Sequence, residues 1–187
     1  PPTFNNLYWP GSGNPNLKPE KSKNREASIH YETEQHHASL TYYRNDISDL
    51  IEWAPAGGVW IPGNVAEAQL SGWTLAYAGD WAGLRLAASL DLQEPEDSKR
   101  GKLLRYRAKQ IAKFAVSRDF GPLNLGVEAQ VSGRRYNDTA NLQELSGYGI
   151  VNLSASYRLD KGWSVFARAN NVFDKKYVLV RDYSTPE

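Results

Sequence analysis

Apolar and polar residues alternate with a period of two through most of this chain, and this pattern constrains its fold more than any other feature. Between residues 123 and 131, apolar side chains occupy every second position, and Asn, Gly, Glu and Gln occupy the positions between them. The same alternation recurs at residues 27–31, 38–43, 84–92 and 151–158. Successive side chains of a β-strand point to opposite faces, so each segment predicts a strand with one apolar face. A helical period fits none of these segments.

Eight strands of this kind are predicted, and the connections between them alternate in length. The predicted strands span residues 22–33, 37–53, 65–78, 83–93, 104–118, 122–136, 147–159 and 162–178. The short connections lie at residues 33–37, 79–83, 119–122 and 160–162, and the long ones at residues 54–64, 94–103 and 137–146. Short turns on one side and long loops on the other are typical of outer-membrane β-barrels, in which the turns face the periplasm.

Two fold classes share such alternation, a soluble β-sandwich and a transmembrane β-barrel. The predicted strands are longer than the usual length of about five or six residues. Their polar face carries Arg, Glu, Gln, Asn and Ser, as a water-filled lumen would. Aromatic residues lie near both ends of the strands, as interfacial girdles do: Tyr77, Trp81, Phe120, Tyr157 and Trp163 near the turns, and Trp53, Tyr136 and Tyr148 near the loops. The predicted fold class is therefore all-β, an antiparallel transmembrane β-barrel.

Hydropathy and composition exclude several other classes. The mean hydropathy is −0.59, and no run of about 18 apolar residues is present, which excludes a transmembrane helix. The 22 basic and 21 acidic residues give a net charge of +1 without a concentrated basic block, so no nucleic-acid partner is predicted. The absence of cysteine removes disulfides, thiolate metal ligands and cysteine nucleophiles.

Polar clusters that resemble catalytic or metal sites are better explained as solvated surface. Adjacent His36 and His37 point to opposite faces of a strand, so they cannot easily share a metal ion. Glu94, Glu96 and Asp97 are predicted to form a solvated acidic loop, because no EF-hand spacing accompanies them. No serine stands on a nucleophile elbow and no Gly-rich phosphate loop is present. No catalytic residue, metal site or cofactor is predicted, and an outer-membrane hydrolase stays only an alternative.

Two motifs connect this pattern to a known family. Residues 13–22 read GNPNLKPEKS and residues 169–177 read ANNVFDKKY, and they resemble the NPxLKPE and NxFDKxY signatures of TonB-dependent outer-membrane receptors. Residues 43–51 resemble the up-going strand that follows the first motif. We expect the motif residues to shape the rim of the barrel and not to contact ligand: Asn14, Pro15, Leu17, Lys18, Pro19, Glu20, Asn170, Asn171, Phe173, Asp174 and Tyr177. The residue before a proline is pushed out of the α region, which explains part of the first motif.

The resemblance implies a larger protein. The family fold is a barrel of the 22-strand type with an N-terminal plug in its lumen, so residues 1–187 would form the C-terminal part of that barrel, with about eight of its strands. The chain starts at Pro1 without a signal peptide, and the plug, the TonB box and the final strand are expected outside it. The implied location is the bacterial outer membrane, crossed many times, with outer-membrane lipid around the barrel and TonB contacting the plug.

Within the family, residues 103–110, which read LLRYRAKQ, resemble the cobalamin receptors most. This resemblance implies that the whole protein imports cobalamin, which is then a transported ligand and not a cofactor. The positions most expected to touch it are Arg105 or Tyr106, at the rim of a long loop, and Tyr183 in the last loop. Uptake of a siderophore or haem is the first alternative, and a small structural barrel built from these eight strands alone is another.

Overall fold

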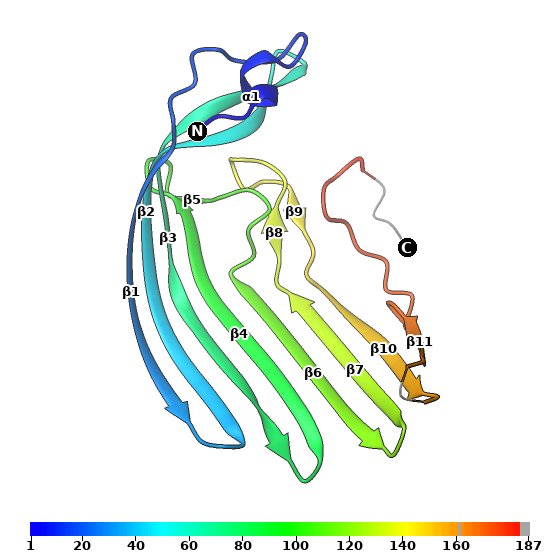
Figure 1. Ribbon diagram of the computed structural model, residues 1–187. Helices are drawn as coiled ribbons and strands as arrows, with labels where there is room; N and C mark the ends of the chain where they lie inside the picture. The colour runs from blue at the N-terminus through cyan, green and yellow to red at the C-terminus, as the bar shows by residue number, and fades with distance from the viewer. Residues whose placement is uncertain (161, 184–187) are drawn as a thin grey trace.

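One curved antiparallel sheet carries most of the chain in the computed structural model, which describes residues 1–160 and 162–183 (Figure 1). Its long strands confirm the prediction of eight, in the order β1-β2-β3-β4-β6-β7-β10-β11. Their bounds are β1 Lys21–Glu32, β2 His36–Ala56, β3 Val59–Trp81, β4 Leu84–Asp97, β6 Gln110–Phe120, β7 Leu123–Ser132, β10 Tyr148–Arg158 and β11 Ser164–Ala169. The smaller elements are helix α1 (Phe4–Tyr8), strand β5 (Lys102–Leu103) beside β4, and the pair β8 (Arg135–Tyr136) and β9 (Glu144–Leu145). The sheet is open and forms a partial barrel wall.

The register places the alternating apolar residues on one continuous face. Ile29 lies opposite Leu40, and Leu40 lies opposite Leu75 on the next strand. Further along the sheet, Val127 lies between Val116 and Leu153. Since directly opposite residues share a face, the apolar face predicted from the sequence is confirmed. The other face carries polar side chains, among them Thr74, whose hydroxyl lies 2.6 Å from the Asp91 carboxylate.

The apolar face is open to its surroundings. Ile29 is 74% exposed and Leu75 is 50% exposed. Within the residues that the structure describes, no second layer covers this face (Figure 1). The buried apolar side chains lie instead toward the loop end of the sheet: Leu17, Ala68, Leu104, Ala108 and Leu145. A soluble sandwich would bury the apolar face between two sheets, so the structure favours the barrel class over it.

Two predicted loops are partly strands. The segment predicted as the loop 54–64 continues β2 and β3 as a two-stranded ribbon that turns at Gly57 and Gly58. Both glycines have positive φ, 60° and 86°, as a two-residue hairpin turn requires. The prediction of an acidic loop is also wrong for its first residues. Glu94, Glu96 and Asp97 belong to β4, where Glu96 pairs with Leu103 of β5.

Three predicted strands are shorter than expected, and the one predicted to reach residue 136 ends at Ser132. The strand predicted to begin at residue 104 begins at Gln110, because Tyr106 has a φ of 58° and cannot continue an extended chain. The strand predicted to reach residue 178 ends at Ala169. Asn171 and Asp174, with φ of 48° and 47°, turn the chain out of the sheet there.

Aromatic residues mark both ends of the apolar face. Near the turns, the Tyr77 hydroxyl lies 2.9 Å from Nδ1 of His36, whose ring also contacts Trp81. Near the loops, the rings of Tyr42 and Trp73 lie 5.1 Å apart. Tyr148 was predicted to belong to the aromatic girdle near the loops. This prediction is wrong, because Tyr148 pairs with Ser132 on the polar face. None of the described helices is long and apolar enough to cross a membrane.

Candidate functional site

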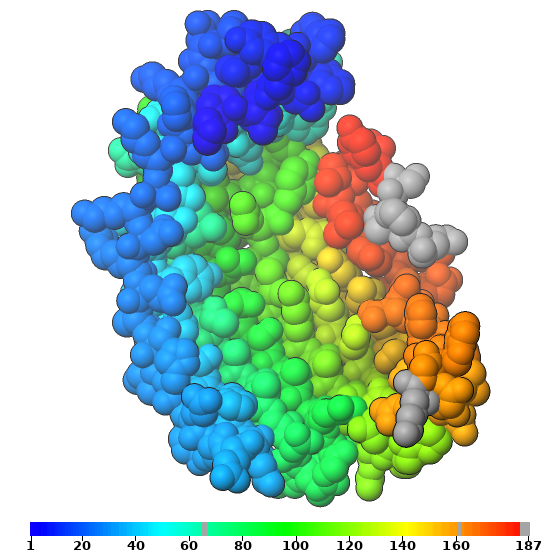
Figure 2. All heavy atoms as spheres, viewed as in Figure 1, coloured from blue at the N-terminus to red at the C-terminus, as the bar shows by residue number. Residues whose placement is uncertain are grey.

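Four segments meet at the end of the sheet opposite the short turns, and we call them together the loop assembly (Figure 1). They are the upper part of the β2–β3 ribbon, residues 49–65; the β4–β6 connection, residues 98–109; the β7–β10 connection, residues 133–147; and the segment after β11, residues 171–183. Helix α1 and the segment leading to β1 lie against the ribbon, and the last segment lies on the other side of the assembly (Figure 2).

Arg105 joins three of these segments. Its side chain is buried, with 5% of the residue exposed. Nε donates to the carbonyl oxygen of Asn137 at 2.6 Å, Nη1 donates to the carbonyl oxygen of Trp53, and Nη2 donates to the Tyr106 hydroxyl at 2.5 Å. The guanidinium also lies 4.6 Å from the ring centroid of Trp60 and 4.7 Å from that of Tyr106. These contacts satisfy a buried cation with oxygen acceptors and aromatic faces.

Asn137 brings in the fourth segment. Its Oδ1 accepts from the Tyr106 hydroxyl at 3.1 Å and from the backbone N–H of Arg181 at 3.2 Å. The backbone N–H of Tyr106 donates to the carbonyl oxygen of Tyr136 at 2.9 Å. The sequence gives no signal for Asn137, because its partners lie 31 and 44 residues away in the chain.

Asn141 and Asp138 shape the β7–β10 connection. The Asn141 amide accepts from the N–H of Leu103 at 2.7 Å and donates to its carbonyl oxygen at 2.9 Å, so one side chain pairs with β5 as a strand would. The Asp138 carboxylate accepts from the N–H groups of Ala140, Leu142 and Gln143. Burial alone would raise the pKa of Asp138, but these backbone N–H groups lower it below its ordinary value.

Glu52 is the acidic group that faces Arg105. Burial raises the pKa of Glu52 above its ordinary value, although Arg105 and then Arg100 act to lower it. Arg100 itself forms an ion pair with Asp97 at 2.8 Å. No group of three or more His, Cys, Asp or Glu side chains that could hold a metal ion occurs in the described part of the chain.

A second buried arginine fixes the segment after β11. Arg135, 4% exposed, donates from Nη2 to the carbonyl oxygen of Val178 at 2.7 Å and lies 5.1 Å from the ring centroid of Tyr148. The Tyr148 ring stacks on Tyr177, with centroids 4.2 Å apart. Tyr177 of the second sequence motif therefore connects the chain after β11 to the start of β10.

The first sequence motif docks on the β2–β3 ribbon. Asn14 Nδ2 donates to the carbonyl oxygen of Pro62 at 3.0 Å, and the N–H of Lys18 donates to Oδ1 of Asn64 at 2.9 Å. The Glu20 carboxylate accepts from the N–H of Ile51 at 2.8 Å. Leu17 is buried at this contact, and Pro15 and Pro19 flank it in the sequence.

The second motif closes a turn directly after β11. The Asn171 side chain accepts from the N–H of Lys175 at 3.0 Å and donates to its carbonyl oxygen at 3.2 Å. Asn170 accepts from Arg168 at 2.8 Å, and Asp174 pairs with Lys176 at 3.0 Å. Phe173 is exposed at the tip of this turn.

The predicted ligand-contact residues lie in two parts of the loop assembly. Arg105 and Tyr106 sit at the junction of three segments, with Arg105 buried and Tyr106 half-buried. Tyr183 is 73% exposed and lines a groove with a volume of 580 Å³ between residues 144–147 and 175–183. Trp60, 43% exposed, is an aromatic side chain beside Arg105 that the sequence analysis missed.

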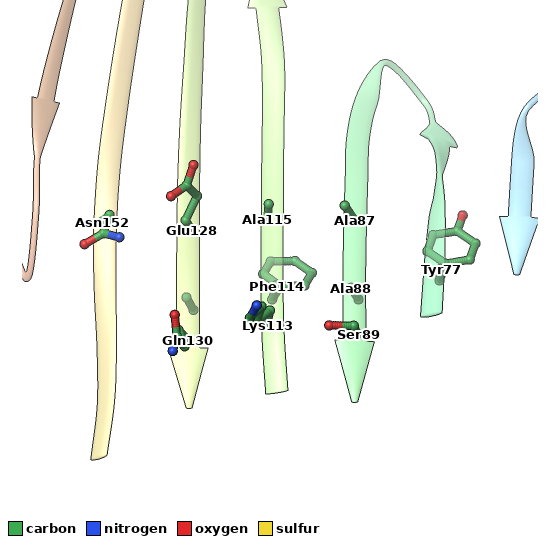
Figure 3. A pocket seen from close by; sticks show the side chains of 11 residues that line it. Tyr77, Ala87, Ala88, Ser89, Lys113, Phe114, Ala115, Glu128, Gln130 and Asn152 are labelled. Atoms are coloured by element: carbon green, nitrogen blue, oxygen red, sulfur yellow. The ribbon is translucent and has the colours of Figure 1, made fainter. Parts of the chain in front are cut away.

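Below the loop assembly, the polar face carries charged side chains in register. Lys113 of β6 lies opposite Gln130 of β7, and Glu128 of β7 lies opposite Asn152 of β10. These residues line a hollow on the sheet (Figure 3). Glu128 also pairs with Arg168 of β11. Such a surface suits contact with water or with another polar surface.

Comparison with known proteins identifies the family. Residues 1–172 match the family model described as TonB dependent receptor-like, beta-barrel. The chain is 41% identical over 191 residues to a vitamin B12 transporter BtuB of Photobacterium profundum, covering 100% of this chain and 32% of that protein. It is 33% identical over 178 residues to a vitamin B12 transporter BtuB of Vibrio vulnificus, covering 94% of this chain and 29% of that protein. The chain thus spans about a third of the length of these relatives.

Solved structures agree on the fold. The copper transporter OprC has a TM-score of 0.75 at 20% identity, covering 92% of this chain and 29% of its own. A ferric enterobactin receptor (PfeA) from Pseudomonas aeruginosa has a TM-score of 0.70 at 27% identity, covering 87% of this chain and 27% of its own. From the family match, the relatives and the sheet geometry, we conclude that this chain belongs to the TonB-dependent receptor-like β-barrel family.

Proposed function

We propose that this chain forms part of the barrel wall and loops of an outer-membrane receptor that imports cobalamin with energy delivered through TonB. The observation that carries this proposal is the 41% identity to a vitamin B12 transporter over the whole chain. In this proposal cobalamin is cargo and not a cofactor, the protein is not an enzyme, and TonB contacts a plug domain outside this sequence. Residues 1–187 would then be the C-terminal part of the barrel.

The open apolar face supports a position in the outer membrane. Its exposed side chains, such as Ile29 and Leu75, would meet lipid, and the polar face would line the lumen. The loop assembly would then lie outside the cell, because in this barrel class the short turns are periplasmic.

Tyr106 and Tyr183 are the proposed ligand contacts in the loop assembly. Tyr106 is half-buried at the junction of three segments, and Tyr183 is exposed along the groove. Tyrosine combines a large apolar ring with a polar hydroxyl, which suits a ligand with both apolar and polar surface. Arg105 stays a predicted part of this site.

Cobalamin binding by the full-length protein in detergent, measured by calorimetry, tests the proposal. We expect wild-type binding, and weaker binding by Tyr106→Ala and Tyr183→Ala. Tyr157→Ala is the matched control, because Tyr157 is an exposed tyrosine near the short turns. A siderophore receptor is the second candidate, favoured by the ferric enterobactin receptor at 27% identity. Binding of iron-loaded enterobactin without binding of cobalamin would replace the first proposal with the second.

A further inference from the structure

We infer that Arg105 is a positioning residue, which holds Tyr106 and the loops around it in a preformed arrangement and does not itself touch the ligand. The inference rests on the proposed function only for the identity of the ligand that Tyr106 meets. Its structural part, the dependence of Tyr106 on Arg105, concerns the protein without ligand.

The guanidinium has little capacity left for a ligand. Each of its three nitrogens donates to an oxygen of the protein, on Asn137, Trp53 and Tyr106. Two aromatic rings lie against it, and 5% of the residue is exposed. These bonds use three of the five N–H groups, and the low exposure of the residue keeps the other two from solvent. A ligand that displaced the present acceptors would leave buried carbonyl oxygens without donors, which is unfavourable.

Tyr106 is held in a backbone conformation that it would not adopt by itself. Its φ of 58° lies in the left-handed region, which non-glycine residues occupy rarely. Such a conformation persists only where surrounding contacts enforce it, and these residues concentrate at functional sites. Here Tyr136 accepts from the Tyr106 N–H, Asn137 accepts from the hydroxyl, and Arg105 binds both the hydroxyl and the ring.

One side chain therefore sets the relative position of three loops. Trp53 and Asn137 lie 52 and 32 residues from Arg105 in the chain, and both accept from its guanidinium. Loops that are already ordered lose less conformational freedom when a ligand binds, so preorganisation raises affinity. Lysine cannot replace Arg105 in this role, because one ammonium group does not reproduce the planar fork of donors.

Arg135 provides a matched control in the same assembly. It is as buried as Arg105, donates to Ser132 and to the carbonyl oxygen of Val178, and lies over the Tyr148 ring. These contacts fix a different pair of segments. A general loss of loop stability would follow from either arginine, whereas the position of Tyr106 depends on Arg105.

The first measurement is hydrogen exchange of the full-length protein without ligand. Arg105→Lys should speed exchange in peptides that contain the Tyr106 amide, by about tenfold if one hydrogen bond's worth of local stability is lost. Arg135→Lys should speed exchange mainly in the segment after β11, which Arg135 binds, and by less in the Tyr106 peptides. If Arg105→Lys does not fold, Tyr106→Phe, which removes the hydroxyl between Arg105 and Asn137, should give a smaller increase in the same peptides. Unchanged exchange in the folded variants would overturn the inference.

The second measurement is cobalamin affinity in a double-mutant cycle. Arg105→Lys should weaken binding about tenfold in the wild type and by much less in the Tyr106→Ala background, because a positioning residue acts through Tyr106. Equal losses in both backgrounds would mean that Arg105 acts on the ligand directly, and the inference would be wrong. If the wild-type protein binds no cobalamin while Arg105→Lys still speeds exchange at Tyr106, the proposed function fails and the positioning role stands.

Discussion

Three charged residues at the loop end, Arg105, Arg135 and Asp138, bind backbone groups of neighbouring segments or of their own loop. Arg105 and Arg135 both donate to carbonyl oxygens, and Asp138 accepts from three N–H groups. A buried charge without such partners would be costly, so each of these bonds ties a loop conformation to a particular side chain. Glu52 differs, because burial raises its pKa by more than the neighbouring arginines lower it.

Asp138 should stabilise the β7–β10 connection at neutral pH. Its folded-state pKa lies below the ordinary value of 3.8, so its contribution is present above that pH and is lost as the pH falls through the lowered pKa. Asp138→Ala leaves three N–H groups to solvent and should cost about 1 kcal/mol at pH 7. Urea unfolding of the full-length protein checks this, with Asp138→Asn, which keeps one acceptor oxygen, expected to cost less.

Glu52 should have the opposite pH dependence. Its folded-state pKa is raised above 4.5, so its ionised form disfavours the folded state. Its contribution to stability is fully present below pH 4.5 and is lost as the pH rises through the raised pKa. Glu52→Gln should therefore be more stable than wild type at pH 7, by less than about 1 kcal/mol after solvent screening, and equal to it at pH 4. Melting temperatures of the variant and the wild type at the two pH values test this prediction. A variant that is less stable than wild type at pH 7 would contradict it.

At the scale of strands, the sequence predicts which side chains share a face, because alternation is local. It does not predict structure that depends on contacts between distant segments. The faces of β1, β2, β4, β7 and β10 follow from the period of two, because side-chain direction is a local property. The sequence predicts a loop for the end of the β2–β3 ribbon, because Gly57, Gly58 and the prolines are typical loop residues. The partners that stabilise the ribbon, Asn14 and Lys18, lie 48 and 46 residues from the atoms that they bind. The sequence does not predict the hydrogen bonds of Arg105 and Asn137 either, because their partners also lie far away in the chain. The early end of β11 could have been predicted from Asn171, because asparagine tolerates the left-handed conformation and favours turns.

The two faces of the sheet should respond differently to charge. Leu86→Arg on β4 or Val127→Arg on β7 would place a cation among lipid chains and should destabilise the full-length barrel by about 2–4 kcal/mol. Ser89→Arg and Gln130→Arg, on the same strands but on the polar face, should cost clearly less. Urea unfolding in lipid vesicles measures both pairs. Equal costs on the two faces would mean that the apolar face is packed against protein.

At the scale of the molecule, the sheet has two free edges. Within the described residues, β1 pairs with β2 alone and β11 pairs with β10 alone. The outer N–H and C=O groups of such edges would lack partners in lipid, where every backbone polar group needs one. Full-length relatives are about three times longer than this chain, and the remaining wall of a barrel would supply these partners.

We therefore expect the isolated 187-residue chain neither to insert stably as an open sheet nor to transport cobalamin. It should aggregate or pair its edges with another copy. Refolding in detergent, followed by heat-modifiable gel mobility, size determination and cobalamin binding, checks this. A monodisperse, heat-modifiable monomer that binds cobalamin tightly would show that the expectation is wrong.

Every long strand pairs with the strands nearest to it along the chain. The turns between β3 and β4 and between β6 and β7 contain two residues each, Ala82-Gly83 and Gly121-Pro122. Hairpins with such short connections close quickly, whereas joining distant strands first requires closing a long loop of chain. This part of the wall can therefore form one hairpin at a time from local contacts. The pairing that completes the ring joins strands far apart in sequence, and contact order predicts that it forms last and limits the folding rate.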